Sequence, residues 1–347
     1  MLRVAGIFLL GVGSLVIGSE LLLRLLPVST ATETGYYIDP LIMTSPPYHT
    51  FRAATGWDLR NAQTLRTNNF GFVADRDFER DERAVALIGD SFVEASMLPA
   101  DQRPGAQLQQ ALPTRPVYVM GTPGTNLLDY AESVRVASQK FGVRDLVVMM
   151  ERFDVGESFC GSGNVGAVCL DPDTLAARTE IKPAAGPMKA VLRHSALAQY
   201  VFSQIKLNPA RLWQQVIAQA RPDTAAVPAA GETSPTPANK EFLRKLDAVT
   251  RTFFERIRPY RDGKLVIVLD SDREALARGA TSAEPGRAQF IKSARAQGAI
   301  VVDTEPLYRT HFARSELGLR VGPYDGHLNP LGVAIAMKAA AQAMRGD

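Results

Sequence analysis

Five short apolar runs, separated by longer stretches with helical periodicity, dominate the pattern of this chain. The runs are rich in Val, Ile, Leu and Met, as strands buried on both faces of a parallel sheet are. They cover residues 84–88, 116–120, 144–150, 264–270 and 299–303, and the helical patterns cover 126–140, 239–259, 284–297 and 330–345. This alternation predicts an α/β fold, a three-layer α/β/α sandwich around a mainly parallel sheet. Such folds place their ligands at the carboxyl ends of the strands.

The first segment of the chain predicts a membrane helix. Residues 4–19 carry no charge, and the apolar stretch becomes long enough to cross a bilayer core if Glu20 and Arg24 are tolerated near its end. The basic residue ahead of the stretch favours a cytoplasmic N-terminus, which would send the rest of the chain across the membrane. We therefore expect residues 1–27 to form an uncleaved, single-pass transmembrane signal anchor. A cleavable signal peptide ending near Ala31, or a buried core helix, would be the alternative.

The remaining chain is predicted to contain one sandwich domain, over residues 83–347, with two additional segments. Residues 28–82 form an aromatic-bearing prelude that we expect to act as a stalk or a lid. Residues 155–240 form an insertion between the third and fourth strands, with a helix-like stretch over 187–219. The Pro/Ala-rich stretch 221–240 lacks the apolar content to pack and is predicted to be a flexible loop.

Composition narrows the class of protein. The 347 residues are 46% hydrophobic, which is sufficient for a full α/β core and excludes a chain that is disordered throughout. The formal net charge is only +3, and the basic residues are scattered rather than clustered. A nucleic-acid partner is therefore not expected.

The chain contains two cysteines, Cys160 and Cys169, in a Gly-rich stretch. In an exported chain this spacing predicts a disulfide that closes the loop between them. Two thiols without a neighbouring histidine or a further cysteine do not fill a tetrahedral zinc site. We therefore expect no metal site. No cofactor is expected either.

A serine, an acid and a histidine carry the candidate chemistry. Ser91 stands in a Gly-Asp-Ser turn directly after the first predicted strand, and Asp325 and His327 stand just before the last predicted helix. A serine hydroxyl becomes an effective nucleophile when an imidazole takes its proton and a carboxylate orients the ring. Asp325 and His327 are two residues apart, so in an extended segment both side chains leave the same side of the backbone. These three residues are predicted to catalyse acyl transfer.

Other polar residues near these segments are expected to be structural. Asp90 should stabilise the turn before the serine, and Asn329 should cap a helix whose first residue is Pro330. The remaining histidines lack an adjacent carboxylate and a motif, and we expect surface or core roles for them: His49, His194 and His311.

The serine segment and the Asp-x-His segment together resemble the SGNH/GDSL hydrolase family, specifically its membrane-anchored bacterial envelope branch. In that branch a GDSF turn opens the domain and a D-x-H-x-N-x-x-G stretch closes it. The resemblance covers roughly residues 56–347, with no family signal between residues 155 and 262. Further matching segments are Gly56-Trp57, Arg66 to Phe72, the serine segment with Glu94, and Gly121 to Asn126.

The resemblance implies an oxyanion hole that includes the backbone N–H groups of Ser91 and Gly124. The family adds the side chain of an Asn in a Gly-x-Asn-Asp block after the third strand. When Asp154 is aligned with the Asp of that block, Phe153 takes the place of the Asn and Glu151 that of the Gly.

The missing side-chain donor matters for the expected rate. Losing one preorganised donor costs about a hundred- to a thousandfold in rate. Asn126 and Arg152 are the candidates to replace it.

The sequence therefore predicts a serine-dependent esterase or deacylase that removes acyl groups, O-acetyl above all, from an envelope carbohydrate. One alternative is an O-acyltransferase that delivers the acyl group to a sugar hydroxyl. The other is a catalytically weak protein that keeps the cleft to bind glycan. In each case the expected partners are an acylated carbohydrate or other small ester and the inner membrane, with the domain on the periplasmic side.

Overall fold

The computed structural model describes residues 2–30, 33–183, 186–205, 237–281, 284, 286–323 and 325–346. The chain divides into two compact units. The smaller unit is built from residues 1–32, 51–64 and 185–236, and the larger one from residues 33–50, 65–184 and 237–347. The predicted boundaries after residues 27 and 82 remain predictions.

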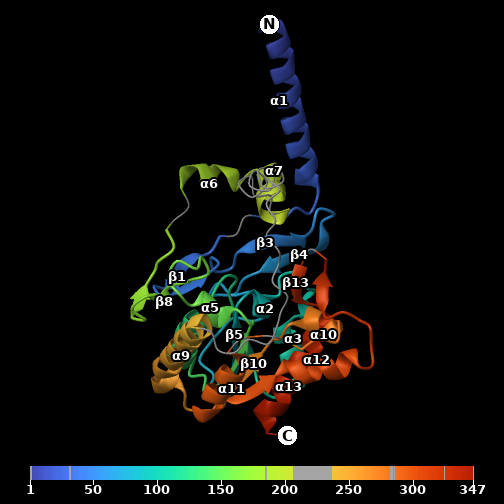
Figure 1. Ribbon diagram of the computed structural model, residues 1–347. Coiled ribbons are helices and arrows are strands. Elements are labelled where there is room, and N and C mark those ends of the chain that lie inside the picture. Colours follow the sequence, from blue (N-terminus) through green and yellow to red (C-terminus); the bar gives the residue numbers. More distant parts are fainter. Residues whose placement is uncertain are drawn as a thin grey trace. The chain divides into compact units, whose positions relative to one another are not determined.

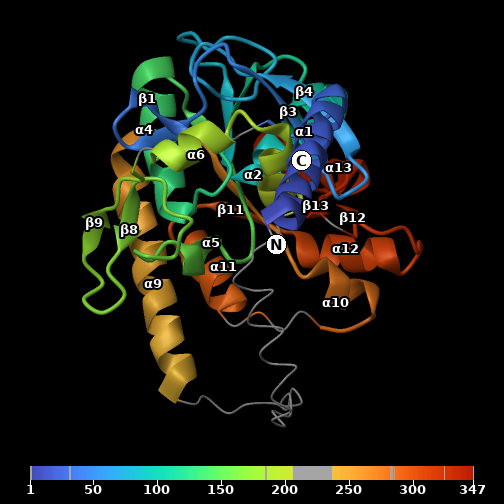
Figure 2. The same ribbon diagram turned by 90° about the horizontal axis from the view of Figure 1, so that it is seen from above.

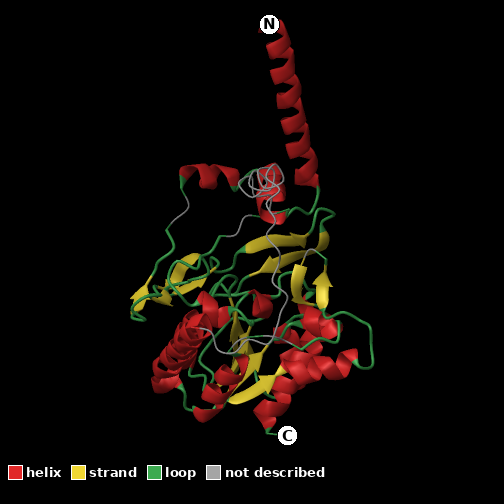
Figure 3. Ribbon diagram, in the orientation of Figure 1, coloured by secondary structure: helices red, strands yellow, loops and turns green. Residues whose placement is uncertain are grey.

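The five predicted strands form one parallel sheet in the larger unit. They are β5 (Val85–Gly89), β6 (Val117–Gly121), β7 (Asp145–Met150), β10 (Leu265–Leu269) and β11 (Ile300–Asp303). Their order across the sheet is β6-β5-β7-β10-β11, and all four pairings are parallel. Figure 3 shows strands in yellow among helices in red. β6 lies on one side of β5 and the later strands lie on the other, so the connections between strands change direction at β5. Such folds place their ligands at the carboxyl ends of the two strands where this change occurs, here β5 and β7. The α/β class predicted from the apolar runs is confirmed.

Helices cover both faces of this sheet, because alternate residues of each buried strand point to opposite sides. Ala86 and Ile88 of β5 join one core cluster with residues of α4 (Leu127–Phe141), α9 (Pro237–Ile257) and α11 (Arg287–Ala296). Val85 and Leu87 join the other cluster with α3 (Pro104–Ala111), α12 (Thr304–Phe312) and α13 (Pro330–Arg345). The two helical layers flank the strands in Figures 1 and 2. The predicted three-layer sandwich is confirmed.

Shorter elements complete the larger unit. The helical ones are α2 (Ser91–Glu94), η1 (Ala100–Gln102), α5 (Asp154–Glu157), η3 (Arg258–Tyr260) and α10 (Arg273–Ala277). Three antiparallel pairs join β1 (Gly35–Asp39) to β2 (Ile42–Thr44), β8 (Val168–Leu170) to β9 (Ala177–Thr179), and β12 (Arg320–Gly322) to β13 (Asp325–Leu328).

The smaller unit contains α1 (Leu2–Leu25), the apolar helix predicted at the start of the chain. Its window Arg3–Leu25 has a mean hydropathy of 2.0 and is 6% buried, so its length and composition suffice to cross a membrane. Near its end, the Glu20 carboxylate accepts hydrogen bonds of 2.9–3.1 Å from the Ser195 hydroxyl and from the first backbone N–H groups of α7 (Ala196–Ala198). Glu20 therefore ties the last turns of α1 to α7.

The other elements of this unit are short. A hairpin of β3 (Thr50–Thr55) and β4 (Arg60–Arg66) contributes its residues 51–64, and α6 (Pro187–Leu192) and η2 (Gln199–Gln204) flank α7. The helix-like stretch predicted over 187–219 thus begins as these short helices, and its part after residue 205 lies outside the described residues.

The loop predicted over residues 221–240 lies outside the described residues up to residue 236. The prediction is wrong for its last four positions, residues 237–240, because they are helical: α9 already begins at Pro237. A proline suits the first turn of a helix, where its missing N–H is not needed, so the proline that favoured a loop in the sequence marks a helix start.

Candidate active site

The turn after β5 places Ser91 at the carboxyl edge of the sheet. Asp90 caps α2, because its Oδ1 accepts a 2.8 Å hydrogen bond from the Phe92 N–H, which is the turn-stabilising role predicted for it. A Cβ on Gly89 would lie 2.7 Å from the Met149 carbonyl oxygen, and one on Gly121 would lie 2.6 Å from the Glu94 nitrogen. Glycine at position 89 lets β5 lie close to β7, and glycine at position 121 lets α2 sit directly against β6.

The chain's last strand brings the predicted base to this serine. The His327 Nε2 lies 2.8 Å from the Ser91 Oγ, and the His327 Nδ1 lies 2.5 Å from the Asp325 Oδ1. Asp325 and His327 both lie on β13, so the extended backbone turns both side chains to one side, as their spacing predicted. An Nδ1–H donated to the carboxylate leaves Nε2 as an acceptor for the serine proton. The three predicted residues are therefore in mutual hydrogen-bond contact.

Asp90 offers the serine a second acceptor. The Asp90 Oδ2 lies 3.2 Å from the Ser91 Oγ, farther than the His327 nitrogen. Burial raises the pKa of Asp90, with the neighbouring histidine and the Phe92 N–H acting in the opposite direction. The shorter contact, to the imidazole, is the one that activates a nucleophile.

Arg273 supports β13, the strand that carries His327, and was not identified from the sequence. Its Nη2 donates a 2.7 Å hydrogen bond to the Gly326 carbonyl, and its Nη1 lies 2.9 Å from Asp270 Oδ2 in an ion pair. Its guanidinium also lies 5.3 Å from the centre of the Phe92 ring, which in turn lies 4.8 Å from the His327 ring. Asp270 is the last residue of the fourth apolar run and Arg273 follows it closely, so their position at a strand's carboxyl end was the available signal.

A polar pocket of about 250 Å³ opens beside the imidazole. Charged side chains of both signs line it together with Phe92 and His327, and several pair with each other. Arg152 Nη1 lies 2.5 Å from Asp272 Oδ2, and Arg320 pairs with Glu274. The pocket therefore offers many hydrogen-bonding groups without a large net charge.

Two backbone N–H groups are available for an oxyanion. Within the described part of the chain, neither the Ser91 N–H nor the Gly124 N–H has a hydrogen-bond acceptor. Ser91 opens α2, where the first N–H groups have no intrahelical partner. Gly124, with a φ of 72°, lies in the loop after β6, the strand next to β5. Their proposed role as donors is consistent with this availability.

The structure corrects the prediction that Asn126 could serve as an oxyanion donor, because its amide is occupied elsewhere. It caps α4: its Oδ1 accepts from the Leu128 N–H at 2.9 Å and from the Ser158 hydroxyl at 3.1 Å. Its Nδ2 donates to the carbonyls of Asn164 at 2.8 Å and Glu157 at 3.4 Å. All of these bonds hold loops together, so no amide proton is left for a substrate.

Arg152 and Phe153 occupy the loop after β7, where the sequence lacks the side-chain donor. Phe153 is 55% exposed, and the Arg152 guanidinium stacks 4.5 Å above its ring while pairing with Asp272. Asp154 holds this loop in place, because its buried Oδ2 accepts from the Glu151 N–H at 2.8 Å and the Tyr130 hydroxyl at 2.9 Å. Arg152 lines the pocket beside His327 and remains a candidate donor.

Two carboxyl groups near the site, the buried Glu94 and the partly buried Glu151, hold their protons more tightly than usual. Burial raises the pKa of Glu151 to about 7, and Asp270 and Asp90 act in the same direction. Burial likewise raises the pKa of Glu94, in α2, to about 7, while the positive charge of Arg103 lowers it. Both carboxyl groups are thus partly protonated at neutral pH.

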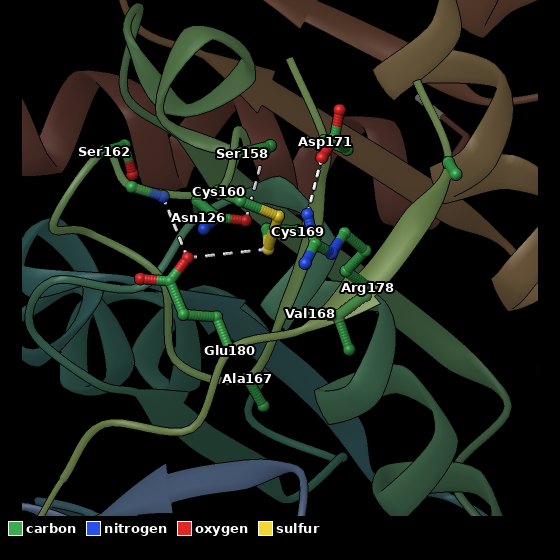
Figure 4. Close-up of a disulfide and its surroundings, with 12 residues drawn as sticks. Asn126, Ser158, Cys160, Ser162, Ala167, Val168, Cys169, Asp171, Arg178 and Glu180 are labelled. Atoms are coloured by element: carbon green, nitrogen blue, oxygen red, sulfur yellow. Dashed lines mark hydrogen bonds and ion pairs between the residues drawn. A yellow bond between two sulfur atoms is a disulfide. The ribbon is translucent and has the colours of Figure 1, made fainter. Parts of the chain in front are cut away.

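The disulfide between Cys160 and Cys169 is present, as predicted (Figure 4). The Glu180 Oε2 accepts a 2.8 Å hydrogen bond from the Gly161 N–H and lies 3.8 Å from the Cys169 sulfur. This trio clusters as metal ligands do, but a sulfur in a disulfide is not a thiolate and does not ligate.

The disulfide loop packs against the start of α4. The N–H groups of Gly166 and Ala167 each donate a 2.8 Å hydrogen bond to the Asp129 carboxylate, and Asn164 binds Asn126 as described above. A Cβ on Gly124 would lie 3.8 Å from the Asn164 Oδ1. The loop therefore borders the backbone of one proposed oxyanion donor.

Comparisons with known proteins concern the fold. No protein-family model and no curated protein sequence matches the chain. Among solved structures it is similar to a lipolytic protein of the G-D-S-L family from Veillonella parvula DSM 2008, with 10% identity, 76% of this chain and 98% of that chain covered, and a TM-score of 0.39. It is also similar to a catalytic mutant of an acetylxylan esterase from Geobacillus stearothermophilus, with 11% identity, 76% and 95% coverage and a TM-score of 0.39.

A third similar structure is LAE5, an alpha/beta hydrolase enzyme from the metagenome of Lake Arreo, Spain. The identity is 13%, the coverage is 78% of this chain and 97% of that chain, and the TM-score is 0.37. These likenesses are distant, so the function proposed for this chain rests on the geometry of its own site.

Proposed function

We propose that the protein is a serine esterase that removes acyl groups from an envelope carbohydrate. The observation that carries the proposal is the continuous chain of contacts from Asp325 through His327 to Ser91, at 2.5 and 2.8 Å. Catalytic nucleophiles, bases and orienting carboxylates stand at such distances.

The arrangement supports a two-step acyl transfer. The Ser91 Oγ attacks the ester carbonyl carbon while its proton passes to His327 Nε2, and the backbone N–H groups of Ser91 and Gly124 bind the oxyanion that forms. When the C–O bond breaks, the leaving alcohol takes the proton from His327. Water then attacks the acyl-serine, gives its proton to His327, and the carboxylic acid leaves as Ser91 recovers that proton.

The substrate class is inferred from the surroundings of the triad. The polar pocket beside His327 presents paired charges and backbone groups, which suits the hydroxyls of a sugar better than an apolar alcohol. The apolar N-terminal helix and the disulfide indicate an extracytoplasmic location. We propose an inner-membrane anchor with the site on the periplasmic side, within reach of acylated envelope glycans.

Labelling by a fluorophosphonate tests the nucleophile. The full-length protein in lipid nanodiscs should acquire one label at Ser91, and Ser91→Ala should acquire none. A wild-type protein that stays unlabelled while remaining folded, by its circular dichroism spectrum, would reject the esterase and leave the glycan-binding alternative.

An O-acyltransferase is the second candidate. The polar pocket has room for an acceptor sugar beside the base, and a sugar hydroxyl bound there would take the acyl group from Ser91 in place of water. Incubating the enzyme with an acetylated glycan, with and without an added sugar acceptor, separates the two reactions. Free acetate in both cases supports hydrolysis, whereas acetylation of the added sugar at the expense of free acetate supports transfer.

A further inference from the structure

A second pocket, of about 290 Å³, lies near the polar one and is mainly apolar. It lies at the carboxyl ends of β7 and β10, among α5, α9 and α11. Its apolar lining consists of Phe153, Val155, Phe242, Leu246, Leu269 and Phe290. Two of these rings are well exposed: Phe153 at 55% and Phe242 at 41%. Apolar surface left in contact with water is stabilised when an apolar ligand covers it.

Arg152 connects this pocket to the triad. It lines both the apolar pocket and the polar pocket that contains His327. Its guanidinium pairs with Asp272 on the polar side, and its face rests on the Phe153 ring on the apolar side. A ligand group that starts at the site beside His327 therefore passes this Arg–Phe pair to enter the apolar pocket.

Two charged groups at the border of the apolar pocket, Arg287 and Glu284, are already paired with opposite charges. Arg287 pairs with Glu284 at 2.8 Å and with Asp303 at 2.5 Å, and it also donates to the Asp270 carbonyl at 2.6 Å. Because Arg287 and Glu284 are already paired with opposite charges, neither requires a charged occupant in the pocket. The polar pocket, by contrast, exposes hydrogen-bonding groups next to the base.

We infer that the apolar pocket binds the acyl chain of the ester, and that this chain is longer than acetyl. The inference rests on the proposed function, since it assigns the two pockets to the two halves of one substrate: the acyl chain and the sugar alcohol. A cavity of about 150 Å³ accommodates benzene, so the present volume suits a chain of roughly six to ten carbons. Phe153 then serves as a wall of the acyl site at the position where the resemblance expects an oxyanion donor.

A chain-length series measures this directly. The full-length enzyme in nanodiscs is assayed on p-nitrophenyl esters from acetate to dodecanoate, with empty nanodiscs and Ser91→Ala as blanks. Burial of each added CH₂ should raise kcat/KM up to about fourfold. We expect the rise to continue to about eight to ten carbons and then to stop, because the pocket is full.

Substitutions at the pocket give the matched comparison. Phe242→Glu places a charge at the exposed mouth and should lower kcat/KM for octanoate at least tenfold, with acetate within twofold of wild type. Leu317→Glu is the control, because Leu317 is an equally apolar residue, 66% exposed, that does not line the pocket. Leu246→Trp, which fills the pocket from α9, should shift the cutoff to shorter chains.

The possible outcomes test the acyl pocket and the esterase reaction separately. A flat chain-length profile in an enzyme with Ser91-dependent acetate hydrolysis overturns the acyl pocket and leaves the esterase intact. A Phe242→Glu defect that depends on the sugar and not on acyl length also overturns it, in favour of an acceptor site. If no ester is hydrolysed, the proposed function fails, and calorimetry with octanoate then tests whether the apolar pocket binds an acyl chain. Binding by wild type that is lost in Phe242→Glu supports the acyl pocket. No binding by wild type rejects it.

Discussion

The substitution Asn126→Ala separates a structural amide from a catalytic one. The sequence left Asn126 as a candidate oxyanion donor, whereas the structure places it at the N-terminus of α4 with its amide fully bonded. An alanine there removes the cap, which costs about 1 kcal/mol. It also leaves the Asn164 carbonyl and the Ser158 hydroxyl without this partner, which adds about 1 to 3 kcal/mol for groups that stay buried.

Together these losses amount to about 2 to 4 kcal/mol of unfolding free energy. For a domain of this size that corresponds to a fall in Tm of roughly 5 to 15 °C. Turnover of an activated ester at 15 °C, well below the transition, should stay within about threefold of wild type. A lost oxyanion donor would instead reduce turnover about a hundred- to a thousandfold.

Differential scanning calorimetry and an ester assay on the same preparation provide both readouts. Ser158→Ala is the control, because it removes one of the four bonds to the Asn126 amide and should lower the Tm by a smaller amount. If Asn126→Ala melted within about 2 °C of wild type but lost a hundredfold in turnover, the amide would face the substrate, and our reasoning would be wrong.

Three further predictions concern the base, a partly buried acid and the disulfide. His327→Ala should lower kcat by on the order of 10⁶-fold and Asp325→Asn by roughly 10⁴-fold, since the second change only misorients the ring; near-normal turnover in His327→Ala would refute the assignment. The pKa of Glu151 is raised from 4.5 to about 7, so between these pH values the folded state holds a proton that the unfolded state has released. The unfolding free energy of the protein should therefore fall by up to about 3 kcal/mol as pH rises from 4.5 to 7. Urea unfolding at both ends of the window should show a flatter dependence in Glu151→Gln, and an unchanged slope would contradict the raised pKa. Replacing Cys160 and Cys169 by serine should cost about 2 to 3 kcal/mol of unfolding free energy, which a thermal melt measures; an unaltered Tm would show that the loop needs no cross-link.

The strands, the helices and the two segments that carry the candidate triad could be predicted because their signals are local. A strand buried on both faces must be apolar throughout, so the runs at 84–88 and 264–270 already mark β5 and β10 within a residue or two. The Asn329-Pro330 pair marks the start of α13 in the same way, through the side-chain cap and the fixed φ of proline. Asp325 and His327 share a side because a strand repeats every two residues.

Only the tertiary structure decided what lies opposite these residues. Asn126 lost its candidate catalytic role because the disulfide loop brings Asn164 to its amide, and Arg273 gained a supporting role because the last strand brings Gly326 to its guanidinium. The apolar pocket likewise joins four segments that are distant along the chain. Periodicity and capping depend on neighbours within one or two turns, so the sequence by itself determined the elements and the segments of the candidate triad. Hydrogen-bond partners and pocket walls depend on contacts between remote segments, which exist only once the sheet and its helices have packed.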